Sequence, residues 1–169
     1  KDLTFIQNLT AFSSLLGLTF LVPAIIHQQA ITGPIINAIL LIASSVLSPS
    51  SAMLIGMLPS TVALSRGLLP LPLAPMVPFI ILGNALYVYL FSKVKDKNFA
   101  LGVVAAASAK FGLLWTASQL VLQNLLPGKL IPKVSQMMSW PQLATALVGG
   151  LLAWVVLTGL NLTTKDKQE

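Results

Sequence analysis

The sequence predicts an all-α integral membrane protein, a compact single-domain bundle of six transmembrane helices. Two observations carry this prediction. Hydrophobic residues make up 56% of the 169 residues, charged residues only 8%, and the mean hydropathy is +0.88. A soluble domain of this size exposes far more charge, so lipid is the expected solvent for most of the chain. The apolar residues also fall into six stretches, which prolines, polar breaks and charged loops separate.

The six expected spans lie at about residues 4–22, 35–47, 52–65, 76–92, 99–126 and 140–162. Pro23 follows the first span. Four prolines lie within residues 66–78, a segment that overlaps the start of the fourth span. The second and third spans are short, because a helix of residues 35–47 reaches about 20 Å whereas the hydrocarbon core is about 30 Å thick. Either flanking residues extend both into full spans, or the pair forms a re-entrant hairpin shielded by neighbouring helices. Two full spans are the preferred interpretation.

The distribution of basic residues predicts the orientation. With six spans both termini lie on one side, and that side carries Lys1, Lys93, Lys95, Lys97, Lys165 and Lys167. The opposite side carries Arg66, Lys129 and Lys133, so the positive-inside rule puts both termini in the cytoplasm. The four acids, Asp2, Asp96, Asp166 and Glu169, fall on the cytoplasmic side as well. The positive net charge is therefore assigned to topology, and no nucleic-acid partner is expected.

The residue inventory leaves little material for catalysis. The chain has no Cys, a single His, and no acid inside an expected span, so neither a metal site nor a cofactor is predicted. A serine beside Lys110 would form a nucleophile–base dyad, but serines are common here and the pairing carries little weight. The chain is therefore predicted not to be an enzyme.

Lys110 is the most informative residue, because it lies near the middle of the expected span 99–126. An ionisable side chain at membrane depth is costly unless it faces protein or water, so it marks a candidate functional site. The alternative is that Lys110 pairs with a carbonyl or a polar side chain and only fixes packing. The first interpretation is preferred.

Other polar and aromatic groups at membrane depth extend this candidate site. Each buried amide alone serves equally well as a contact between helices, but several from different spans favour a polar ligand site. Lys110 and Gln119 lie on nearly opposite sides of a regular helix, so one straight helix cannot present both to one pocket. The predicted substrate-binding residues are Asn84, Lys110, Trp115, Gln119, Gln142 and His27, and the predicted helix-packing residues are Ser13, Gly17 and Gly149.

Three segments, HQQAITGPIINAILLIASSVL, LPSTVALSRGLLPLPLAPMVPFIILGNAL and MMSWPQLATALVGG, resemble the substrate-binding S-components of energy-coupling factor (ECF) transporters, in a branch without an assigned substrate. The resemblance covers nearly the whole chain. It implies uptake of a vitamin-like or micronutrient molecule through a bacterial plasma membrane, with a site near the outer face. It also implies a coupling membrane subunit and ATPases supplied in trans, since no GxxxxGK[ST] motif occurs here.

Two further functions fit the sequence. A passive small-solute channel, or a non-transporting subunit of a membrane complex, would use Pro59 and the short second and third spans as a broken pair that lines a pore. Saturable binding by the isolated protein distinguishes the binding subunit from both. An intramembrane enzyme would rest on Lys110 and a serine alone.

Overall fold

The computed structural model describes residues 2–125 and 131–160, and in these ranges the chain is helical with no strand, as expected. The longest helices are α1 (Asp2–Ile25), α2 (Gln29–Val46), α5 (Val77–Val94), α6 (Phe99–Leu125) and α8 (Trp140–Gly159). Between α2 and α5 lie the short helices α3 (Pro49–Ile55) and α4 (Leu58–Ser65) and the 3-10 helix η1 (Leu71–Met76). The short helix α7 (Ile131–Met137) precedes α8.

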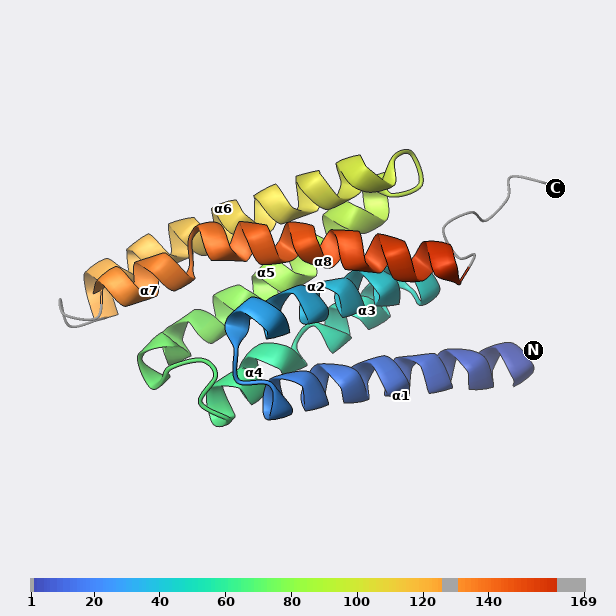
Figure 1. Cartoon of the computed structure of the whole chain (residues 1–169), viewed down its shortest axis with the longest axis horizontal. Coiled ribbons are helices and arrows are strands. Elements are labelled where there is room, and N and C mark those ends of the chain that lie inside the picture. The colour runs from blue at the N-terminus through green and yellow to red at the C-terminus, as the bar shows by residue number, and fades with distance from the viewer. Residues whose placement is uncertain (1, 126–130, 161–169) are drawn as a thin grey trace.

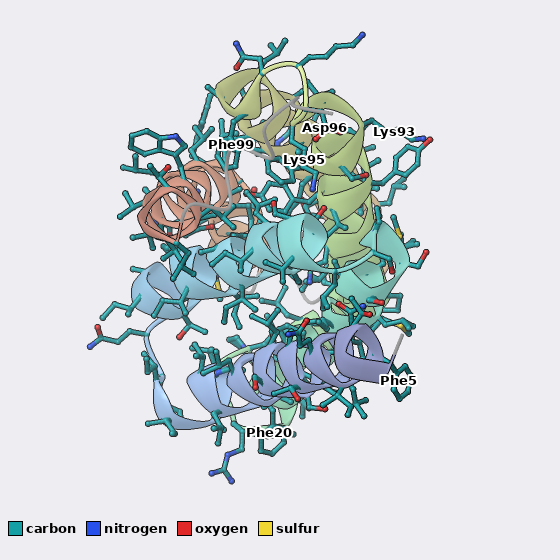
Figure 2. The ribbon with its side chains drawn as sticks, turned by 90° about the vertical axis from the view of Figure 1, so that its right-hand side faces the viewer. Phe5, Phe20, Lys93, Lys95, Asp96 and Phe99 are labelled. Carbon is teal, nitrogen blue, oxygen red and sulfur yellow. The ribbon has the colours of Figure 1, made fainter. Side chains whose placement is uncertain are left out.

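The helices run back and forth along the long axis of the molecule, and α3 and α4 together make one of these passes (Figure 1). The start of α1, the end of α8 and the turn between α5 and α6 lie at the same end of the bundle, which we call the terminal end. The loops after α1 and α4 lie at the other end, which we call the pocket end. Figure 2 views the terminal end, where Lys93, Lys95 and Asp96 gather at the α5–α6 turn.

Within the described residues, five segments are long and apolar enough to cross a membrane: Thr4–Ile25, Gln29–Val46, Leu71–Val94, Phe99–Val121 and Ser135–Gly159. Their burial within the protein differs. Only 11% of the apolar window of α1 is buried, against 56% for α2. Helix α2 therefore lies at the centre, packed mainly on α8 and also on α1, α3 and α5, while Phe5 and Phe20 project from the outer surface of α1 (Figure 2).

The second and third expected spans differ from the structure. Helix α2 begins at Gln29 and continues through Pro34, so its 18 residues reach about 27 Å instead of 20 Å. A proline inside a membrane-type helix is tolerated where neighbouring groups satisfy the freed backbone atoms. The third expected span, residues 52–65, is not one helix but the pair α3 and α4, which meet at Gly56 and Met57. Pro59 has no N–H to continue the hydrogen-bond ladder back to α3, which accounts for the break.

The other boundaries lie close to those expected. Helix α1 runs past Pro23 to Ile25, and α5 ends two residues later than predicted. Helix α8 ends at Gly159, before the expected limit at residue 162. Outside the described residues lie position 126, positions 161 and 162, and the topology-setting residues Lys1, Lys129, Lys165 and Lys167.

Two buried aromatic side chains of α5 connect the helices in the central core. Tyr87 of α5 is fully buried, and its hydroxyl donates a hydrogen bond of 2.8 Å to the backbone carbonyl of Ala146 in α8. Phe91, one turn further along α5, is also fully buried and packs edge-on against Phe99 at the start of α6. The core cluster around them is completed by Ala38, Leu41, Val103, Ala106, Ala107, Ala146 and Ala153.

Candidate ligand pocket

Lys110 is buried in the interior of the bundle, with 4% of its surface exposed. Its ammonium group donates one hydrogen bond of 2.6 Å to Oδ1 of Asn37 in α2 and one of 2.8 Å to Oδ1 of Asn84 in α5. It also lies 5.2 Å from the centre of the Tyr87 ring. Three helices that are distant in the sequence thus meet at one ammonium group, and the contacts to it are two neutral amides and an aromatic face.

Asn84 extends this network to the break between α3 and α4. Its Nδ2 donates a hydrogen bond of 2.8 Å to the backbone carbonyl of Gly56. In a continuous helix that carbonyl would accept from the N–H of residue 60, four positions later. Because Nδ2 faces Gly56, Oδ1 faces Lys110, so the orientation of the amide follows from its two partners. Asn84 therefore links the break between α3 and α4 to the buried Lys110 through two hydrogen bonds.

Asn37 is held in place by the close packing of α2 and α8. A Cβ atom added at Gly149 would lie 2.5 Å from Cβ of Asn37 and 2.8 Å from the backbone oxygen of Pro34. Only glycine fits this contact, and the absence of a side chain brings α8 against the turn of α2 that carries Asn37. At Gly150 an added Cβ would collide with the side chain of Val103 in α6. The two glycines thus set the spacing of α8 from α2 and α6.

A pocket of about 100 Å³ opens beside Lys110 towards the pocket end of the bundle. Its walls come from α2, α4, α5, α6 and α8, from the loop after α4, from Pro23 of α1 and from Met138 between α7 and α8. Part of the lining is apolar, namely Pro23, Ile36, Pro59, Ala63, Leu68, Leu69, Ile80 and Met138. The polar side chains are those of Gln29, Thr32, Asn37, Ser60, Asn84, Lys110, Gln142 and Thr145. The pocket therefore joins an apolar enclosure to a cluster of hydrogen-bonding groups.

Ser60 contributes an unusual group to this lining. Its side chain is 5% exposed, and its hydroxyl has no hydrogen-bond partner within the described part of the chain. A buried hydroxyl without a partner is destabilising, and most buried polar atoms in proteins are paired. Ser60 is also one of the residues that line the pocket beside Lys110.

No carboxylate compensates the Lys110 ammonium group in the described part of the protein. Its hydrogen bonds go to amide oxygens rather than to an acid or to a serine hydroxyl. Asp96 lies at the terminal end, on the turn between α5 and α6 (Figure 2). An ammonium has three N–H groups, and two of them are accounted for by Asn37 and Asn84. Lys110 thus has no third hydrogen-bond acceptor among the described residues.

The structure brings together three of the six residues predicted for the site. Lys110, Asn84 and Gln142 line the pocket, and Nε2 of Gln142 also donates a hydrogen bond of 3.1 Å to the carbonyl of Met137. The remaining three lie elsewhere. His27 is exposed in the loop after α1, with Nδ1 3.1 Å from the carbonyl of Ile25. Trp115 is 49% exposed, and Gln119 lies one turn beyond it, on the side of α6 nearly opposite Lys110.

Of the residues predicted for helix packing, Gly149 is buried against α2 as described above. Ser13 and Gly17 lie on the exposed helix α1, and a Cβ added at Gly17 would meet no atom within 4 Å. Among the described residues, no other helix therefore approaches closely at Gly17.

The predicted substrate-binding residues did not include Asn37 and Ser60, which line the pocket. Asn37 was recognisable as an amide inside an expected span, but its pairing with Lys110 depends on the register of α2 against α6. Ser60 lies next to Pro59, and nothing in the local sequence distinguishes it from the other serines. The signal that could have found it is the proline, since a helix break at membrane depth is accepted only where protein or a cavity shields it. No protein-family model, curated protein or solved structure matches this chain.

Proposed function

We propose that the chain is a multi-pass protein of the bacterial plasma membrane with both termini in the cytoplasm. Five long apolar segments and the large exposed apolar side chains on α1, α6 and α8 support insertion into lipid. The even number of passes puts the start of α1 and the end of α8 at one end (Figure 1), together with Lys93 and Lys97 of the α5–α6 turn. Under the positive-inside rule this end is cytoplasmic and the pocket end faces outward.

We further propose that the chain is a substrate-binding subunit for uptake of a small vitamin-like or micronutrient molecule. One observation carries this proposal: the pocket is lined by the buried Lys110 and by Ser60, whose buried hydroxyl has no hydrogen-bond partner among the described residues. Pockets that join an apolar wall to a few convergent polar groups are the usual form of small-molecule sites. A lysine that served packing alone would not require a cavity beside it.

Transport then requires partners. No nucleotide-binding loop occurs in the sequence, so ATP hydrolysis is assigned to ATPases that act through a separate coupling membrane subunit, as the ECF resemblance implies. Helix α1 is the least buried of the long helices and carries Ser13 and Gly17 on an open surface. This surface is where we expect the coupling subunit to contact the chain.

The broken pair α3 and α4 is the one feature that favours the alternative, a passive channel. Two observations weigh against it. The carbonyl released at the break is bound by Asn84 rather than directed into an open path. One turn deeper than the pocket residues, Leu41, Tyr87 and Ala106 are fully buried on α2, α5 and α6. This packing, one turn nearer the terminal end, supports a binding site rather than an open pore.

The test is a thermal-shift screen of the detergent-purified protein against vitamins, their precursors and nucleobase-like heterocycles. A ligand at one hundred times its dissociation constant adds about 2.7 kcal/mol to stability, which raises the melting temperature measurably. The proposal predicts at least one compound that raises it in a saturable way. If a broad panel leaves the melting temperature of folded protein unchanged, the proposed function is wrong, and a channel or a subunit without a ligand takes its place.

A further inference from the structure

The pocket groups define the charge of the ligand more narrowly than the proposed function does. We propose that the site takes a small monocarboxylate with an apolar body, whose carboxylate group binds the ammonium of Lys110 and the hydroxyl of Ser60. This inference rests on the proposed function for its biological meaning, but its chemistry follows from the side chains of the pocket alone.

The first argument concerns charge. Among the described lining residues Lys110 is the one with a charged side chain, and its described hydrogen-bond partners are neutral. Separating a charge from water is costly unless an opposite charge compensates it. A monocarboxylate makes the occupied pocket neutral. A phosphate dianion would leave an excess negative charge in the same enclosure, and an amine would place two cations side by side.

The second argument concerns hydrogen bonds. A carboxylate is an acceptor without donors, and its two oxygens accept from several donors at once. The donors on offer among the described lining residues include the remaining capacity of the Lys110 ammonium and the hydroxyl of Ser60, which has no partner in this part of the chain. Asn37 and Asn84 turn their oxygens towards Lys110, so their role is to position the ammonium rather than to bind the anion.

The third argument concerns size and polarity. The pocket volume of about 100 Å³ is somewhat smaller than the roughly 150 Å³ apolar cavity that holds a benzene molecule in another protein. Ile80 and Leu69 lie in its wall and supply an apolar surface, whereas Gln142 and Thr145 add amide and hydroxyl groups. A carboxylate attached to a short chain therefore matches the enclosure better than one attached to a ring.

Ser44 provides an internal control for Ser60. Both serines are buried, and both hydroxyls lack a hydrogen-bond partner within the described part of the chain. They differ in position, because Ser60 lines the pocket and Ser44 does not. Replacement of either serine by alanine removes an unpaired buried hydroxyl and should affect folding similarly. Only Ser60→Ala should affect the ligand.

The experiment measures melting shifts of the full chain in detergent with linear monocarboxylates from acetate to octanoate, with cyclohexanecarboxylate and with benzoate. Each acid is paired with its amide and its amine, and benzoate also with phenyl phosphate, up to millimolar concentrations. The wild-type protein should bind at least one carboxylate at least tenfold more tightly than the matched amide, amine or phosphate. Ser60→Ala should weaken that binding about tenfold, the usual order for loss of a hydrogen bond to a charged group, and Ser44→Ala should leave it unchanged.

Three outcomes overturn the inference. The amide or amine binds as tightly as its carboxylate, or Ser60→Ala and Ser44→Ala behave alike, or no carboxylate in the series binds. If a neutral or cationic compound in the panel binds instead and Ser60→Ala weakens it, the carboxylate inference is wrong while the binding-subunit proposal stands. If neither this panel nor the broader vitamin screen yields a ligand, both are wrong.

Discussion

The ammonium of Lys110 and the amide oxygen of Asn37 lie 2.6 Å apart although 73 positions separate them in the sequence. This contact joins α6 to α2, the most deeply buried of the long helices. It also puts the cation against a neutral acceptor rather than a counter-ion. Hydrogen bonds thus fix the position of the Lys110 side chain, and no described partner carries an opposite charge.

Asn37→Asp supplies a counter-ion with almost no change in shape. The new carboxylate would accept the same hydrogen bond from Lys110 and would compensate its charge from inside the protein. We expect the melting temperature of the ligand-free protein to stay equal or to rise, and the affinity for a carboxylate ligand to fall by at least tenfold. Titration of both proteins with the same ligand measures the change. Undiminished affinity in the variant would mean that Lys110 does not bind the anion.

Asn84→Ala removes the link between the lysine and the helix break. The Gly56 carbonyl and one donor of Lys110 would both lose their partner, so we expect a loss of about 2–4 kcal/mol in the free energy of unfolding. Denaturant unfolding in mixed micelles measures it. Asn98→Ala is the comparison, because Asn98 is exposed and only caps α6, a role worth about 1 kcal/mol. Equal losses in the two variants would show that the buried network adds nothing.

Gly149→Ala tests the close approach of α8 to α2. The added methyl would meet the backbone of Pro34 and Ala38 as well as Asn37, and backbone cannot move aside easily. We expect a destabilisation of about 1–3 kcal/mol and weaker ligand binding, since Asn37 would be displaced. Gly112→Ala is the control: a Cβ there meets no atom within 4 Å, so the helix should be unaffected or stabilised by about 0.5–1 kcal/mol. A tolerated Gly149→Ala would contradict the packing described here.

The proposed orientation can be measured with single cysteines, because the chain has none of its own. Gln28 and Lys97 are exposed in loops at opposite ends of the bundle. In intact cells, a membrane-impermeant maleimide should label Gln28→Cys and should label Lys97→Cys only after the membrane is permeabilised. The reverse pattern would place the pocket on the cytoplasmic side and would rule out uptake from outside through this site.

The sequence predicted the helical architecture. The composition of the chain and the length of its apolar stretches reflect the lipid solvent and do not depend on how the helices contact one another. It also identified Lys110, Asn84 and Gln142, since polar groups at membrane depth are conspicuous. It placed Trp115 and Gln119 in the same site, but the pocket lies on the Lys110 side of α6. A single helix cannot resolve such a choice, because only packing against α2, α5 and α8 decides which side is buried.

The missed features are those that depend on contacts between distant segments. Pro59 could have suggested the break at Gly56 and Met57. The hydrogen bond from Asn84 to the Gly56 carbonyl could not be predicted, because it depends on the register of α5 against α3. Helix α2 was expected to begin after Pro34, whereas it begins at Gln29 and brings Thr32 and Gly33 into the wall of the pocket. Helix propensity predicts that a helix begins or ends near a proline, but Pro34 lies inside α2 because the helix packs in the interior of the bundle.

The most direct test of the account is a calorimetric titration of the purified protein with the compound that gives the largest melting shift. Three proteins are compared: the wild type, Lys110→Met, and Lys97→Met as a control at an exposed lysine. We predict saturable binding of one molecule per chain to the wild type and the control, and at least a hundredfold loss in Lys110→Met, with retained folding checked by its melting curve. Equal binding by Lys110→Met and the wild type, or binding that never saturates, would contradict a ligand site built around Lys110.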